Sequence, residues 1–173
     1  MTTKYGGALV DLGNVIIAYW LSNITPENFH AIDYNSIPEV PDAFDSIKQL
    51  NVHYGGNVTI VYKASNVATE KVFGWLEFHQ FSERTGIPMS RVYHSRNGRD
   101  KTAHIAQASV TYHGTSIVVD DRLEVLNYFV GKVPHLFLFR PQAREIEQFN
   151  ISEVLSHVYI VHTWQEVLHI LKK

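Results

Sequence analysis

Short apolar runs alternate with longer amphipathic segments along this chain. The short runs are rich in Val, Ile, Leu and Phe, which is typical of buried β-strands. They predict strands over residues 7–10, 58–62, 91–93, 115–119, 135–139 and 158–161. Apolar residues at helical spacing, with Pro41 in a first turn and Thr163 as an N-cap, indicate helices as well. These helices are predicted over residues 41–50, 67–84, 101–110, 123–129 and 163–171.

Strands that alternate with helices favour one architecture. Each helix returns the chain so that the next strand can run parallel to the last, which predicts an α/β three-layer sandwich around a mainly parallel, Rossmann-like sheet. The chain has 173 residues, which suits one domain with its own core, and no repeat or linker divides it. In such sheets ligands bind beyond the carboxyl ends of the strands, so functional residues are expected there.

Composition and charge narrow the functional classes. Fifteen basic and seventeen acidic residues give a net charge of -2, which argues against nonspecific nucleic-acid binding and against an anionic membrane surface. No apolar run approaches the ~20 residues that cross a membrane, and none is typical of a signal peptide, so the default prediction is a cytoplasmic protein. Because the chain has no cysteine, disulfides, thiolate zinc sites and a cysteine nucleophile are excluded.

Two of the predicted strands end in aspartate. Asp11 follows the first strand, and Asp120 and Asp121 follow the fourth. Carboxylates held close together repel one another and lose hydration, and a hard divalent cation relieves both costs. Mg2+ prefers oxygen ligands, with water and phosphate completing its coordination. Ser65, past the second strand, and Lys101, at the start of the third predicted helix, are placed to contact a phosphoryl oxygen.

This order of an aspartate, a hydroxyl, a lysine and paired aspartates resembles the four motifs of the haloacid dehalogenase (HAD) superfamily. The resemblance spans roughly residues 8–139 and includes a D-L-G-N-V first motif. It implies Asp11 as the nucleophile, Ser65 as the second-motif hydroxyl and Lys101 as the charge-neutralising cation. It also implies Mg2+ as the cofactor, held by oxygen ligands from the first and fourth motifs. These ligands are the Asp11 carboxylate, the Gly13 carbonyl, Asp120 and Asp121.

Three further residues are candidates for substrate binding. Asn14 belongs to the first motif, and Arg96 and Arg99 lie in a loop on the expected active face, where they would bind an anion. The nearest imitator, a response-regulator receiver, also combines acids, a hydroxyl and a lysine, but its acidic pair comes first and here the pair comes last. A Rossmann dinucleotide site and a P-loop are disfavoured because the sequence has neither GxGxxG opening a helix nor GxxxxGK[ST].

Two positions depart from the superfamily's pattern. Gly13 stands where the family usually has a second aspartate, a general acid and base whose help is typically worth ~10²–10⁴ in rate. Ser65 lies further beyond its strand than the family's hydroxyl usually does. These departures keep a second hypothesis open, a catalytically weak or inactive HAD-like domain that binds a phosphorylated ligand or a protein partner.

The room for a cap domain is small. Residues 15–40 suffice for a flap or a minimal cap, and residues 86–90, at the other usual insertion point, hold nothing. We therefore expect one HAD-like domain over residues 1–173 that acts as a Mg2+-dependent phosphohydrolase on a phosphomonoester. By family analogy an open site suits a phosphorylated macromolecule, or a phosphorylated small molecule enclosed by another subunit, so a homo-oligomer stays an open option.

Overall fold

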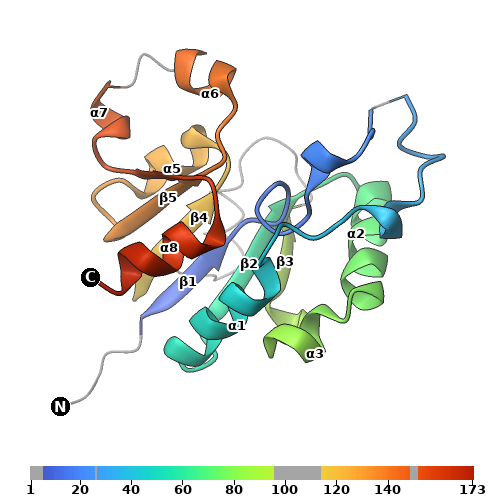
Figure 1. Ribbon diagram of the computed structural model, residues 1–173, viewed down its shortest axis with the longest axis horizontal. Helices are drawn as coiled ribbons and strands as arrows, with labels where there is room; N and C mark the ends of the chain where they lie inside the picture. The colour runs from blue at the N-terminus through green and yellow to red at the C-terminus, as the bar shows by residue number, and fades with distance from the viewer. Residues whose placement is uncertain (1–5, 26, 96–113, 149–151) are drawn as a thin grey trace.

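A parallel sheet forms the centre of the computed structural model, which describes residues 6–25, 27–95, 114–148 and 152–173. The sheet has six strands in the order β3-β2-β1-β4-β5-β6 (Figure 1). They are β1 (Gly7–Val10), β2 (Val58–Lys63), β3 (Val92–Ser95), β4 (Thr115–Asp120), β5 (His135–Phe139) and β6 (Tyr159–Val161). Each neighbouring pair is parallel, which confirms the predicted Rossmann-like α/β fold.

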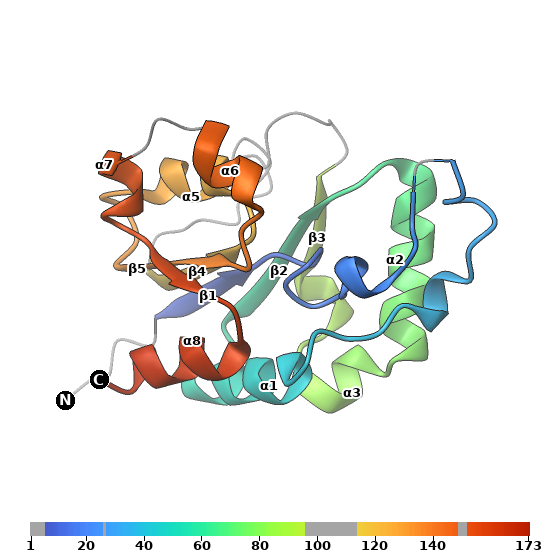
Figure 2. The ribbon, with the colours of Figure 1, turned by 45° about the horizontal axis from the view of Figure 1, so that its top comes forward.

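Helices cover both faces of this sheet (Figure 2). The α-helices are α1 (Ala43–His53), α2 (Asn66–Phe78), α3 (Phe81–Thr85), α5 (Leu123–Phe129), α6 (Ala143–Gln148), α7 (Ser152–Leu155) and α8 (Trp164–Leu171). Short 3-10 helices are η1 (Tyr19–Leu21), η2 (Tyr34–Ser36) and η3 (Met89–Arg91). Among the described residues, no helix is long and apolar enough to span a membrane.

Alternation along the strands divides the core into two layers. Successive strand side chains point to opposite faces of a sheet. Ala8 and Val10 of β1 accordingly belong to the core with α1, α2, α3 and α8. Leu9, between them, belongs to the core with α5. The described residues thus form the expected three-layer sandwich, without a large cap.

The prediction of one helix over residues 67–84 is wrong. The helix ends at Phe78, and Gln80 takes a left-handed backbone conformation with φ 56° before α3 begins. This turn directs Phe81 into the core, where its ring lies 5.3 Å from that of Phe44 in an edge-to-face arrangement. Burying the Phe81 ring thus stabilises the chain more than one unbroken helix over residues 67–84 would. The helix predicted over residues 101–110 lies outside the described residues.

Residues 15–40, which we call the flap, are fastened to the core near both ends. The buried indole of Trp164 in α8 donates from Nε1 to the Val15 carbonyl at 2.8 Å. The buried indole of Trp75 in α2 donates in the same way to the Ile37 carbonyl, also at 2.8 Å. The described part of the flap therefore has a backbone position set by two helices on the same side of the sheet.

Candidate functional site

The strand order places a switch point between β1 and β4. The chain runs outward from β1 to β2 and β3, and then returns to the other side of β1 at β4. Val10 pairs with Val119, and the Asp11 amide donates to the Val119 carbonyl at 2.9 Å. The residues that follow β1 and those that end β4 therefore lie together at the crevice where ligands bind in such sheets.

Three carboxylates meet at this switch point. Asp11, Asp120 and Asp121 each offer one oxygen, and these oxygens lie within 4.8 Å of one another. Asp11 and Asp120 are buried, with 8% and 2% of their surface exposed, and Asp121 is half-buried. The structure thus brings together the three acids that the sequence analysis selected. Carboxylate oxygens at this spacing form a donor set of the kind that Mg2+ prefers.

Hydrogen bonds orient the two acids at the end of β4, Asp120 and Asp121. Asn14 Nδ2 donates to Asp121 Oδ2 at 3.0 Å. Asp120 Oδ1 accepts from the Arg122 amide at 3.0 Å. Asn14 has a left-handed backbone with φ 58°, and its own amide donates to the Ile17 carbonyl at 2.9 Å. The side chain that we selected as a substrate ligand therefore also positions one of the carboxylates.

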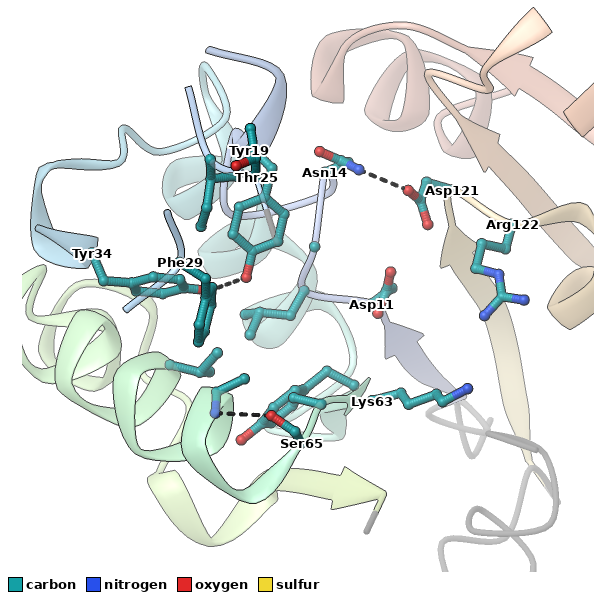
Figure 3. Close-up of a pocket in the computed structure, with 17 residues that line it drawn as sticks. Asp11, Asn14, Tyr19, Thr25, Phe29, Tyr34, Lys63, Ser65, Asp121 and Arg122 are labelled. Atoms are coloured by element: carbon teal, nitrogen blue, oxygen red, sulfur yellow. Dashed lines mark hydrogen bonds between the residues drawn. The ribbon is translucent and has the colours of Figure 1, made fainter. Parts of the chain in front are cut away.

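A cavity of about 1050 Å³ opens beside the carboxylates (Figure 3). At one end its lining is polar and charged, with Asp11, Asn14, Lys63, Asp121 and Arg122. Elsewhere the lining is mainly aromatic and aliphatic, with Thr25 and Ser65 as its polar members. This apolar set is Leu12, Tyr19, Ile24, Phe29, Tyr34, Tyr62, Ala64, Ala68 and Val72. The cavity therefore offers a charged end and an apolar body to a ligand.

Ser65 reaches the cavity but has a structural contact as well. It lines the cavity, and its Oγ accepts from the Ala68 amide at 3.2 Å as the N-cap of α2. Lys63, the last residue of β2, lines the same region and was not among the predicted site residues. Its position at a strand end is the signal that could have selected it. Lys101, Arg96 and Arg99 lie outside the described residues.

Gly13 faces an aromatic ring. A Cβ atom added at Gly13 would lie 3.0 Å from Tyr19 Cε2. The backbone of Gly13 is not in the left-handed region, so an L-side chain is compatible with it. The Tyr19 ring, rather than backbone strain, therefore limits the space where the superfamily usually has its second aspartate.

The tyrosines around the cavity are held in their neutral form. Burial raises the pKa of Tyr34 to about 12 and that of Tyr62 to about 12. The pKa of Tyr19 is raised further, first by burial and then by its interactions with Tyr34 and with the Asp11 carboxylate. The Tyr19 and Tyr34 hydroxyls also bond to each other. These side chains consequently bring aromatic surface to the site without bringing charge.

Among the comparisons with known proteins, only those with solved structures give matches. No protein-family model matches the sequence, and no curated protein matches it either. Among solved structures, D,D-heptose 1,7-bisphosphate phosphatase from B. bronchiseptica, complexed with magnesium and phosphate, superposes with a TM-score of 0.62 at 13% identity. That match covers 96% of this chain and 98% of the phosphatase.

A second solved structure gives the same result. A haloacid dehalogenase-like hydrolase from Streptococcus pneumoniae superposes with a TM-score of 0.63 at 11% identity, covering 98% of this chain and 100% of the other. Both matches extend over nearly the whole of each chain, so the likeness is one of the overall fold. The chain therefore has the fold of the HAD-like hydrolases.

Proposed function

We propose that this protein is a Mg2+-dependent phosphohydrolase of the HAD type, which hydrolyses a phosphomonoester through an aspartyl-phosphate on Asp11. The observation that carries the proposal is the meeting of Asp11, Asp120 and Asp121 at the switch point, beside a cavity with a charged end. The phosphatase fold of a protein determined with magnesium and phosphate supports the same chemistry.

The residues present fit a magnesium ion. The candidate ligands in the cluster are three carboxylates, and among the described residues no histidine or cysteine belongs to it. Such oxygen-only sets favour Mg2+ over zinc or copper. Asp11, Asp120 and Asp121 would hold the ion together with the Gly13 carbonyl, which the family resemblance adds. When bound, the ion would offset the negative charge of the carboxylates and of the substrate's phosphoryl oxygens.

Asp11 is the side chain that we assign to the covalent step. One of its carboxylate oxygens attacks the phosphorus, and the bond from phosphorus to the leaving oxygen breaks. Water then attacks the aspartyl-phosphate, which releases inorganic phosphate and restores the Asp11 carboxylate. Because Gly13 has no side chain, we assign protonation of the leaving oxygen to water rather than to a protein carboxyl group.

The remaining polar residues receive supporting roles. Asn14 holds Asp121 through its amide, which fixes one carboxylate of the cluster. Lys63 and Arg122 line the charged end of the cavity, where cations favour a phosphoryl group. Ser65 lines the same cavity and would donate its hydroxyl to a phosphoryl oxygen. Lys101, Arg96 and Arg99 keep the roles that the sequence analysis gave them as proposals.

Replacement of the nucleophile tests the proposal. The Asp11→Asn protein should lose at least a thousandfold in phosphatase turnover, because an amide is a far poorer nucleophile. A suitable assay is phosphate release from a panel of phosphomonoesters, with Mg2+ and with chelator. Asp45→Asn, which removes an exposed carboxylate from the first turn of α1, is the matched control and should keep full activity.

Two results would overturn the proposed function. One is turnover by the purified Asp11→Asn protein equal to that of the original protein. The other is a folded original protein that binds Mg2+ and releases no phosphate from any member of the panel, which would favour a binding domain instead.

A further inference from the structure

The cavity beside Asp11 is divided by chemistry along its length. Its charged end lies at the strand termini, whereas much of its apolar wall comes from the flap (Figure 3). Tyr19, Phe29 and Tyr34 are the aromatic residues of that wall, beside Ile24 and Thr25 of the flap, and Ala68 and Val72 of α2 also line the cavity. A phosphoryl group that reaches Asp11 would therefore extend its leaving group between aromatic and small aliphatic side chains.

The three aromatic rings pack on one another. Tyr19 and Tyr34 have ring centroids 6.0 Å apart with a tilt of 60°. Phe29 and Tyr34 have centroids 6.1 Å apart in an edge-to-face arrangement. These separations lie in the range in which aromatic rings attract each other through their quadrupoles. The cluster consequently has a defined shape before any ligand arrives.

The wall offers little to a ligand rich in hydroxyls. The Tyr19 and Tyr34 hydroxyls bond to each other, which leaves one hydroxyl proton of the pair to donate to a ligand, and Phe29 has no polar group. A sugar hydroxyl placed against the Phe29 ring would lose its hydrogen bonds to water without gaining new ones, which is costly. A flat apolar ring loses nothing there and gains contact with the ring faces and edges.

We infer that the leaving group of the substrate carries a planar aromatic ring, which the flap residues Tyr19, Phe29 and Tyr34 receive. This inference rests on the proposed function, because it assigns the alcohol part of the same phosphomonoester. The cavity volume of about 1050 Å³ is slightly above the ~300–1,000 Å³ of ordinary ligand sites, so it accommodates a ring and its linker.

A substrate series with similar leaving-group basicity tests the inference. We would compare 2-phenylethyl phosphate, 2-cyclohexylethyl phosphate, thymidine 5'-monophosphate and glucose 6-phosphate, all of which release alkyl alcohols. The kcat/KM for 2-phenylethyl phosphate or for thymidine monophosphate should exceed that for glucose 6-phosphate by about tenfold or more. The first outcome would assign a carbocyclic ring and the second a nucleobase, and either supports a planar ring.

Variants of Phe29 test the wall itself. Phe29→Ala should raise KM for the preferred aromatic substrate by about tenfold and leave kcat within about twofold, because the ring contacts the leaving group and not the reacting phosphorus. Phe29→Leu keeps apolar volume, so its KM should lie between that of the original protein and that of Phe29→Ala. Phe78→Ala is the matched control, because Phe78 lies on α2 with 65% of its surface exposed and does not line the cavity.

Binding provides a readout that does not depend on turnover. Calorimetric titration of the Asp11→Asn protein with 2-phenylethyl phosphate should show binding that Phe29→Ala weakens by a similar factor. The aromatic inference would be overturned by preference for glucose 6-phosphate, or by equal kcat/KM for the phenyl and cyclohexyl esters without a preference for thymidine monophosphate. If phosphate release still depends on Asp11, the proposed function holds even when the aromatic inference fails. Phosphate release by the Asp11→Asn protein at the original rate would instead refute the proposed function itself.

Discussion

Gly13 lacks the side chain from which the superfamily's general acid usually comes, and the Tyr19 ring lies beside it. We expect Gly13→Asp to raise phosphatase turnover on alkyl phosphates by up to ~10²-fold, because the new carboxyl group can protonate an alkoxide-like leaving oxygen. Nitrophenyl phosphate, with a good leaving group, should gain much less. Steady-state kinetics on both substrates, after circular dichroism has checked the fold, measure the difference.

The contact with Tyr19 supplies the control for that experiment. A Cβ atom at Gly13 requires the ring to shift by a few tenths of an ångström. Combining Gly13→Asp with Tyr19→Leu gives the new carboxyl group more room, so the double variant should show at least as large a gain. A folded double variant that binds Mg2+ and hydrolyses no phosphomonoester would favour the binding-domain hypothesis.

The buried tyrosines predict a loss of stability in alkali. Folding raises the pKa of Tyr34 and of Tyr62 from the ordinary value of 10 to about 12, chiefly through burial. The unfolded chain therefore releases protons at a lower pH than the folded chain, and the free energy of unfolding falls as pH rises from about 10 to about 12. Thermal melts across this range should show the decline, and Tyr62→Phe should make it shallower. The prediction would be contradicted if all tyrosines of the folded protein ionised near pH 10, as measured by tyrosinate absorbance.

Among the secondary-structure elements, α8 has a direct connection to the flap. Its Trp164 indole donates to the Val15 carbonyl. Trp164→Phe keeps an aromatic ring but removes the donor, so the free energy of unfolding should fall by about 1–3 kcal/mol. Urea unfolding measures this loss, and amide hydrogen exchange should quicken near Val15. Trp20→Phe is the control, since Trp20 is exposed and its replacement should change stability by less than ~0.5 kcal/mol.

The sequence predicted each of the six described strands to within two residues, because burial on both faces leaves continuous apolar runs. It also placed Asp11, Asp120 and Asp121 together, since strand ends in a parallel sheet share one edge. It did not reveal the turn at Gln80, because the choice between a continuous helix and burial of Phe81 depends on tertiary packing. Helices α6 and α7 were also missed, since they are short and have little periodicity.

The aromatic wall was beyond sequence reasoning for a different reason. Tyr19, Phe29 and Tyr34 come from irregular backbone and short 3-10 helices, where no period relates one side chain to the next. Their convergence depends on how the Trp75 and Trp164 indoles hold the flap. Residue type alone indicates buried aromatics, and only the folded backbone shows that they face the cavity.

For the molecule as a whole, a bound ion should stabilise the native state. A ligand that binds only the folded chain adds about 2.7 kcal/mol at 100 times its Kd, and at roughly 2–4 °C per kcal/mol for a chain of this size Tm rises by roughly 5–10 °C. Differential scanning calorimetry with increasing Mg2+ checks this. Sodium at equal ionic strength controls for screening. Asp121→Asn should reduce the shift, and an unchanged Tm at high Mg2+ would contradict the metal site.

The strand order also determines when the site can exist during synthesis. Asn14 and Asp121 are in hydrogen-bond contact although 107 residues separate them, and β1 lies beside a strand made much later in translation. The apolar residues around Asp11, which are buried in the folded protein, therefore stay exposed until β4 leaves the ribosome and pairs with β1. A nascent chain stalled before β4 would contain Asp11 without Asp120 and Asp121, so the three-carboxylate cluster can form only late in translation.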